Sequence, residues 1–168
     1  WDEMAINEYE QELAVLEQEE RELQFSAFTS EMALTVGMML YEEVKRRGKA
    51  VVIHIARNQQ CLFHLAMEGT TLDNDDWVRR KSNVVHHFGQ SSYHVGTKLR
   101  QQEKTLENKY GLALRDYADH GGAFPLIIKA VGPVGTIAVS GLPQKEDHEL
   151  VVGVLRNYLA ELNGATTR

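Results

Sequence analysis

A lysine occupies a helical position where an amphipathic pattern calls for an apolar side chain. Between about residues 71 and 88, Trp77, Val84 and Phe88 lie within about 40° of one another on a helix of about 100° per residue. Lys81 projects into the middle of this stripe, and Arg80 points toward its edge. Either Lys81 packs its stem and extends its ammonium to water, or it lies at a partly buried anionic or carbonyl-bearing site as a charge partner or a perturbed acid.

The start of the last expected helix shows the same kind of anomaly. Asp147 and His148 both project onto its apolar side within the first turn. Asp147 could be an N-terminal cap or dipole partner, with His148 as a hydrogen-bonded packing residue. Alternatively, the preceding "SGLP" turn and this helix start border a pocket, because strand-to-helix turns with Ser and Gly bind carboxylates or phosphates well.

The segment "DHGGAFPL", residues 119–126, places a histidine directly before two glycines. Gly121 and Gly122 allow close backbone approach or positive φ, and Pro125 can open a strand or lie at a sheet edge. His120 is therefore presented at the end of a sheet. It is either a residue on the rim of a pocket or an ordinary loop histidine.

Metal chemistry has weak support in the sequence. His87 and His94 would lie two helical turns, about 10 Å, apart, and we expect both of them and His86 to be surface residues. The sequence contains no HExxH motif, nucleophile elbow or P-loop, and its single cysteine, Cys61, excludes an internal disulfide and any CxxC motif. We predict no metal site.

Two further histidines lie on the first expected hairpin, "AVVIHIAR" and "CLFHLAM". A two-residue turn at Asn58-Gln59 would pair position 54 with 63 and place His54 and His64 on opposite faces, whereas one more residue would pair them directly. The sequence leaves this register open, so we do not propose a two-histidine site on these strands.

Composition and charge indicate one globular domain. The chain has 168 residues, of which 43% are hydrophobic and 25% charged, and its net charge is −6. The acidic balance and the short basic clusters argue against nucleic-acid binding. No apolar run is long enough to span a membrane and no secretory signal is visible, so with a single cysteine we expect a cytoplasmic protein.

The elements that must position these residues follow from hydrophobic periodicity. An acidic N-terminal helix with a narrow apolar stripe is expected to dock on its own domain or to form a seam with another subunit. The stripe consists of Ile6, Tyr9, Leu13, Leu16 and Leu23, and Glu20 interrupts it. A second helix capped at Thr29 or Ser30 should bury Ala33, Val36, Gly37, Leu40 and Val44.

The remaining elements complete an alternating order. The first hairpin, a helix to about Phe88, a polar stretch of surface helix and loop to about residue 120, and a second hairpin from "FPLIIKAV" to "VGTIAVSG" precede the last helix. Helix, hairpin, helix, hairpin, helix predicts an α/β (α+β) fold with a mainly antiparallel sheet and helices on both faces.

Three motifs in this order resemble those of the GlcG/HbpS-like haem-degrading-domain family, in its compact single-domain branch. They are "GTTLDNDDWVRRKSNVVHHFGQSS", "HGGAFPL" and "VGTIAVSGLPQKEDHELVV", and the likeness runs from about Leu23 to Leu159. The resemblance implies a profilin-like three-layer α/β/α sandwich with about five strands, and a dimer or higher assembly. We divide the chain into an acidic amphipathic helix (1–22), the family-like domain (23–163) and a tail (164–168).

The resemblance also implies a pocket near the Gly-Gly turn and the helix that bears the lysine, with haem or corrinoid-linked roles. The ligand-binding positions carried over by motif are Trp77, Arg80, Lys81, Ser91, Ser92, His120, Gly121, Gly122, Phe124, Ser140, Asp147 and His148. No catalytic residue is assigned.

The leading interpretation is a cytoplasmic, homo-oligomeric haem- or tetrapyrrole-binding protein that assists haem degradation. His120 or His148 would lie near the ligand, and Lys81 or Arg80 would bind a propionate. One alternative is a small-molecule lyase or isomerase that uses Lys81 as an acid or Schiff-base former. The other is an oligomeric scaffold without catalysis, assembled through the N-terminal helix.

Overall fold

The computed structural model describes residues 3–165. They form six helices and four strands in the order expected from the sequence. The elements are α1 (Glu3–Glu22), α2 (Ser30–Arg46), β1 (Val52–Arg57), β2 (Gln60–Ala66), α3 (Leu72–Phe88), α4 (Ser92–Gln102), α5 (Leu106–Tyr110), β3 (Ala123–Ile128), β4 (Gly132–Ser140) and α6 (Gln144–Ala165). The last three residues of the expected tail, 166–168, lie outside the described residues, and α6 runs through Ala165.

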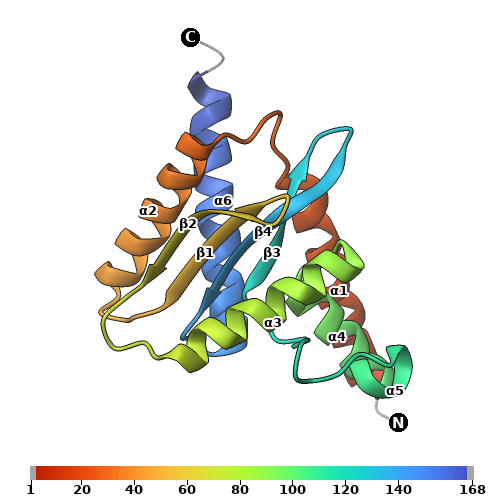
Figure 1. Cartoon of the computed structure of the whole chain (residues 1–168). Helices are drawn as coiled ribbons and strands as arrows, with labels where there is room; N and C mark the ends of the chain where they lie inside the picture. Colours follow the sequence, from red (N-terminus) through yellow and green to blue (C-terminus); the bar gives the residue numbers. More distant parts are fainter. Residues whose placement is uncertain (1–2, 166–168) are drawn as a thin grey trace.

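The four strands form one antiparallel sheet in the order β2-β1-β4-β3. Helices α2 and α6 cover one face and α3 covers the other, which gives three layers (Figure 1). This confirms the predicted fold class with four strands in place of about five. Next to β3 the chain makes only an isolated parallel bridge between Phe25 and Ile128, too short to count as a strand.

The two faces of the sheet carry side chains of different size. Large residues such as Ile53, Phe124 and Ile137 pack under α2 and α6, and small ones such as Ala123 and Ala138 lie under α3. Because side chains alternate along a strand, Thr136 and Ser140 of β4 share the α3 face with Ala138. The layer between α3 and the sheet is therefore narrow, and it contains polar side chains.

The β1–β2 hairpin resolves the register that the sequence left open. Asn58 and Gln59 both have positive φ, as in a two-residue hairpin turn. Ile55 pairs with Phe63 but Ala56 pairs with Cys61, so one extra residue of β2 forms a bulge. The bulge shifts the register and sets His54 directly opposite His64.

The second helix follows its prediction. Thr29 is the N-cap and its side chain accepts a hydrogen bond from the Met32 N–H, and all five expected stripe residues of α2 are buried. Gly37 is required at its position, because a Cβ there would lie 2.5 Å from the Phe63 ring. The hairpin β1–β2 can therefore pack closely on α2.

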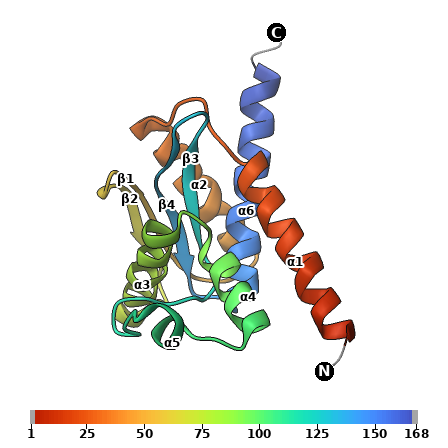
Figure 2. The same ribbon diagram turned by 90° about the vertical axis from the view of Figure 1, so that its right-hand side faces the viewer.

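Helix α4 corrects the expectation of a surface helix in the polar stretch. Tyr93, His94 and Val95 are all buried, because α1 packs along α4 on the side of the molecule seen in Figure 2. His94, expected at the surface, lies inside this contact with Nδ1 2.5 Å from the Glu20 carboxylate. A short-range pattern cannot report burial that a distant helix creates.

Helix α1 docks within its own chain. Leu16 and Leu23 are buried, whereas Ile6 is exposed. Glu20, which interrupts the stripe, pairs with His94, and Glu19 pairs with His148 of α6 at 2.9 Å. Polar positions on the buried side of α1 thus serve as partners for buried histidines.

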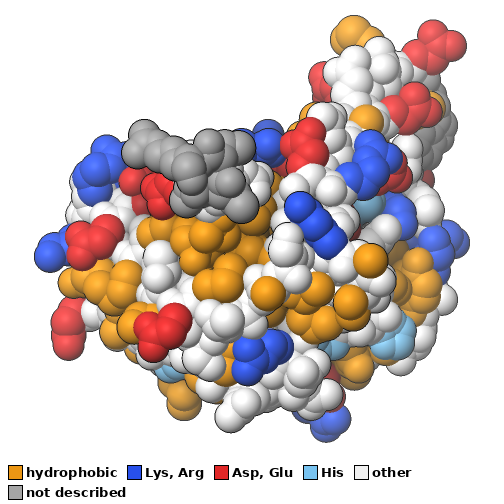
Figure 3. Space-filling model, turned by 90° about the horizontal axis from the view of Figure 1, so that it is seen from above, with side chains coloured by type: hydrophobic (Ala, Val, Ile, Leu, Met, Phe, Trp, Pro, Cys, Tyr) orange, Lys and Arg blue, Asp and Glu red, His pale blue; other side chains and the backbone are white. Residues whose placement is uncertain are grey.

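The outer surface is mixed in character. Viewed from above, hydrophobic side chains gather in the centre of the face, with charged side chains around them (Figure 3). Among the described residues, none of the helices combines the length and the apolar character needed to cross a membrane.

Candidate functional site

The centre of the site is a buried ion pair between α3 and α6. Lys81 is 2% exposed, and its Nζ donates to the carbonyl oxygens of Gly121 (3.0 Å) and Val139 (2.7 Å). Its third contact is with Asp147 Oδ2 at 3.3 Å. Three acceptors match the three N–H bonds of an ammonium, so the side chain is enclosed and does not extend to water.

Burial shifts the pKa of both members of the pair. Burial raises the pKa of Asp147 to about 6, against the opposing effects of the Lys81 ammonium and of the N–H groups of Leu142 and Gly141. Burial also lowers the pKa of Lys81, and the Asp147 carboxylate partly offsets this. Perturbed acids and bases of this kind cluster at functional sites.

The two glycines after His120 make the close packing around Lys81 possible. Gly122 has a φ of +133°, and a Cβ there would lie 2.5 Å from the Val139 carbonyl oxygen and against Lys81 Nζ. At Gly121, a Cβ would collide with the carbonyl oxygen of Gln144. The turn can therefore bring its carbonyl to the lysine only with glycine at both positions.

A pocket of about 240 Å³ opens next to the ion pair. Ten residues line it, contributed by α3, the turn before β3, the end of β4 and the start of α6: Asn74, Trp77, Lys81, His120, Gly121, Ser140, Gly141, Leu142, Gln144 and Asp147. The His120 side chain is 50% exposed and its ring meets the Trp77 ring edge-to-face at 5.0 Å. Burial lowers the pKa of His120, and the Asp119 carboxylate, whose Oδ1 is 3.8 Å from His120 Nδ1, partly opposes this effect. The imidazole is therefore neutral at pH 7.

Six of the twelve positions carried over from the resemblance line this pocket: Trp77, Lys81, His120, Gly121, Ser140 and Asp147. Gly122 lies directly behind Lys81. Whether these residues bind a ligand stays a prediction, but the chain brings them together from four separate elements.

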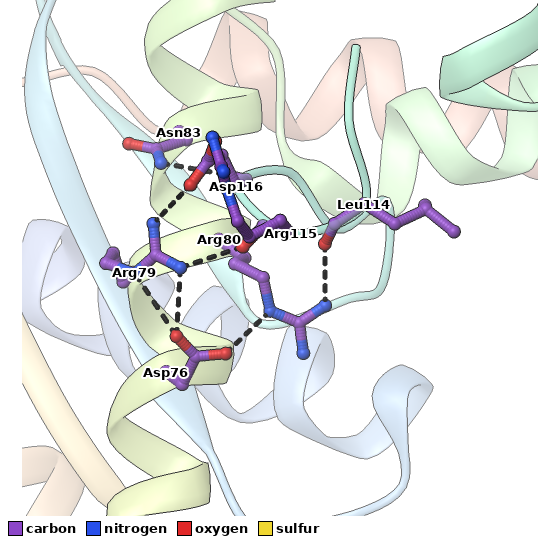
Figure 4. Close-up of polar contacts among 7 residues, drawn as sticks. All are labelled: Asp76, Arg79, Arg80, Asn83, Leu114, Arg115 and Asp116. Carbon is purple, nitrogen blue, oxygen red and sulfur yellow. Dashed lines mark hydrogen bonds and ion pairs between the residues drawn. The ribbon is translucent and has the colours of Figure 1, made fainter.

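Arg80 belongs to a neighbouring network. Its guanidinium lies 4.1 Å over the Trp77 ring and bonds Asp76 Oδ2 (2.9 Å) and the Leu114 carbonyl oxygen (3.2 Å). Figure 4 shows the two hydrogen bonds of Arg80 together with the contacts of Arg79, which hold the loop through residue 116 against α3. Arg80 therefore supports the tryptophan side of the pocket from behind.

The other four positions have structural partners away from the pocket. Ser91 caps α4 through the His94 N–H, and Ser92 Oγ accepts from the Ala123 N–H at the edge of β3. Phe124 lies in the main core, and His148 is buried against Glu19. None of the four lines the pocket, and a ligand-binding role for them stays a prediction.

Two lining residues, Asn74 and Gln144, were missed; Gly141 and Leu142 belong to the "SGLP" turn, which was one of the two interpretations of this segment as a pocket border. Asn74 completes the capping box of α3, and Gln144 Oε1 accepts from the Gly121 N–H at 3.1 Å. In a sequence both look like ordinary helix-start residues. Their proximity along the chain to Trp77 and Asp147 was the available signal.

No group of three or more metal-ligating side chains occurs in the part of the chain that the structure describes. His86 and His87 are exposed on α3, as expected from the sequence, and His94 is the buried exception.

Comparison with known proteins gives a consistent picture. The family model described as "Haem degrading protein HbpS-like" matches residues 28–156. A UPF0303 protein of Serratia proteamaculans is 47% identical over 148 residues, 88% of this chain and 92% of that protein. The crystal structure of the Ybr137w protein superposes with a TM-score of 0.83 at 34% identity, covering 89% of this chain and 88% of the other.

A more distant solved structure, the PduOC:heme complex, has a TM-score of 0.66 at 13% identity over 77% of this chain and 94% of that chain, which shows a shared fold. The family match covers most of the chain and includes every residue of the pocket. The chain therefore belongs to the HbpS-like family of haem-degrading proteins.

Proposed function

We propose that the protein is a cytoplasmic homo-oligomer that binds haem or a related tetrapyrrole at the mouth of the Trp77–His120 pocket and assists haem degradation. The observation that carries the proposal is His120, a neutral, half-exposed imidazole held on the pocket rim by the edge of Trp77. A neutral imidazole is a common axial ligand of haem iron. The family description and the haem complex of a fold relative support this ligand class.

The residues present fit a tetrapyrrole in part. A volume of about 240 Å³ is below the roughly 300–1,000 Å³ typical of pockets that enclose drug-sized ligands, so the macrocycle would lie across the mouth. Lys81 is enclosed and fully engaged, which removes it as a propionate partner. We assign that role to Arg80, whose guanidinium lies over Trp77 and uses Nε for Asp76 and Nη1 for the Leu114 carbonyl oxygen, so that Nη2 is left for a propionate. The iron would supply redox chemistry when bound, and a macrocycle across the mouth would keep its outer face accessible.

The test is a titration of the purified protein with haemin. We expect a saturable shift of the Soret band at one equivalent per chain, with affinity reduced at least tenfold in His120→Ala. His87→Ala is the matched control, because His87 is an exposed histidine of α3 that does not line the pocket. A spectrum equal to that of free haemin, or equal losses in both variants, would overturn the proposal.

A second candidate function is a small-molecule lyase or isomerase. The observation that favours it is the raised pKa of Asp147 beside Lys81 in the wall of the pocket, a pair suited to acid–base chemistry. Borohydride trapping with candidate carbonyl compounds tests the Schiff-base form of this mechanism. A covalent adduct on Lys81 that is lost in Lys81→Arg supports it, and its absence from all compounds counts against it.

A further inference from the structure

A second cluster of titratable side chains lies on the opposite flank of α3, under the β1–β2 hairpin. His54 and His64 face each other across the two strands with their Nδ1 atoms 2.9 Å apart and their ring centroids 5.1 Å apart. They border a separate cavity of about 360 Å³ that Asp75, Arg79 and other residues of α3 also line. None of the residues named for haem binding lines this cavity.

The ion-pair contact of His64 with Asp75 favours one tautomer of the pair. Asp75 Oδ1 lies 3.0 Å from His64 Nε2, and a carboxylate can only accept, so Nε2 of His64 carries the proton. Nδ1 of His64 then presents a lone pair to His54, and the single proton between the rings belongs to His54. Burial lowers the pKa of His54, and the neighbouring imidazole of His64 lowers it further. Both effects favour the neutral form of His54.

We propose that the two Nδ1 atoms form a binding site for a divalent transition-metal ion of the imidazole-preferring class, such as Ni²⁺ or Cu²⁺. With the two nitrogens 2.9 Å apart, an ion about 2.05 Å from each would have an N–metal–N angle of about 90°. This is the angle between neighbouring ligands in a tetragonal site. The proton of His54 moves from Nδ1 to Nε2 when the ion enters.

Asp75 has the position of an outer-shell partner in such a site. A histidine that binds a metal commonly donates its other ring N–H to a carboxylate, which orients the ring and raises its basicity. His64 makes this contact with Asp75 before any ion is present. The site is therefore partly organised by the fold.

Water completes the coordination. Cys61 Sγ is 3.9 Å from His54 Nδ1 and does not form a third preassembled ligand among the described residues. At the inner end of the same cavity, the buried hydroxyls of Ser82 and Thr136 have no hydrogen-bond partner within the described chain. They are placed to bond water in the cavity, as buried polar groups require.

The test is calorimetric titration of the full chain with NiCl₂, followed by Cu²⁺ electron paramagnetic resonance. We expect one equivalent of Ni²⁺ to bind, affinity to fall at least tenfold in both His54→Ala and His64→Ala, and the Cu²⁺ spectrum to show two nitrogen ligands that are lost in these variants. His87→Ala, which changes an exposed histidine of the same helix as Asp75, should bind within twofold of the wild type.

Circular dichroism of each variant establishes that it is folded before titration. Wild-type protein with no saturable Ni²⁺ binding, or His64→Ala with the affinity of His87→Ala, would overturn the proposal. Haemin binding is read separately in the Soret band and depends on His120, so the two proposals can fail independently.

Discussion

The Lys81–Asp147 pair is the residue-scale feature on which the pocket wall depends. One ammonium joins the turn before β3, the end of β4 and the start of α6 through three acceptors. Replacing both members of a buried pair by neutral groups is often tolerated, whereas removing one member leaves an uncompensated charge at a cost of about 3–5 kcal/mol. The pair therefore has more effect on specificity of packing than on net stability.

Lys81→Met should destabilise the protein by about 3–5 kcal/mol at pH 8, because it removes the cation that offsets the burial of the Asp147 carboxylate. Adding Asp147→Asn in the same chain should recover much of the loss, since it removes the unpaired charge. Urea unfolding of the single and double variants measures both effects. A double variant less stable than Lys81→Met would contradict this account of the pair.

The raised pKa of Asp147 gives a pH dependence with a definite sign. The folded value is about 6 against an ordinary value of 3.8, so the folded state holds the proton more tightly than the unfolded state. This contribution to stability is fully present below pH 3.8 and is lost as the pH rises through about 6. The unfolding free energy of the wild type relative to Asp147→Asn should therefore fall between pH 4 and pH 6.5. A difference that rises over this interval would contradict the sign.

Hydrophobic periodicity in the sequence identified Lys81 and Asp147 but not all of the residues around them. Lys81 and Asp147 stand out because each is a charged residue on the apolar side of its helix, which the helical pattern alone shows. His148 offered the same signal, yet its partner Glu19 is 129 positions away on α1, and no short-range pattern connects them. Asn74 and Gln144 were missed because capping at a helix start explains an amide side chain without any pocket.

At the scale of elements, the turn before β3 is the most constrained segment of the site. Gly122→Ala introduces a Cβ at positive φ against the Val139 carbonyl oxygen and Lys81, and should cost at least 1–3 kcal/mol. The matched control is Gly153→Ala in α6, where a Cβ meets no atom within 4 Å and alanine favours the helix by up to about 1 kcal/mol. Thermal and urea unfolding should show Gly122→Ala to be less stable than the wild type and Gly153→Ala to be more stable.

The register of the β1–β2 hairpin and the burial of α4 are two features that the local sequence does not predict. The two-residue turn at Asn58-Gln59 is readable, but the bulge that follows it shifts the register by one, and this alone sets His54 beside His64. Helix α4 looks like a surface segment because its polar residues find partners on α1, as Tyr93 does with Glu12 at 2.6 Å. Both outcomes depend on contacts that lie outside the local sequence.

For the whole molecule, the order of elements and the layer arrangement followed from hydrophobic patterning, since each amphipathic face must be covered by another element. The two predicted hairpins account for all four strands, whereas the count of about five, implied by the family resemblance, is one too high, because the segment around Phe25 makes only a single bridge to β3. The assembly state is still a prediction. The cis docking of α1 on α4 removes the main reason to place a subunit interface on the buried stripe of this helix.

Two adjacent residues of α1 test that conclusion. Leu16 is 3% exposed and Val15 is 58% exposed, so Leu16→Ala should destabilise the fold by about 2–5 kcal/mol while Val15→Ala changes little. Because the Leu16 side chain packs within its own chain, the mass of the assembly measured by light scattering should be the same for both variants and the wild type under folding conditions. A lower mass for Val15→Ala at unchanged stability would instead place a subunit contact on the outward side of α1, and the family-like core would then not be sufficient for assembly.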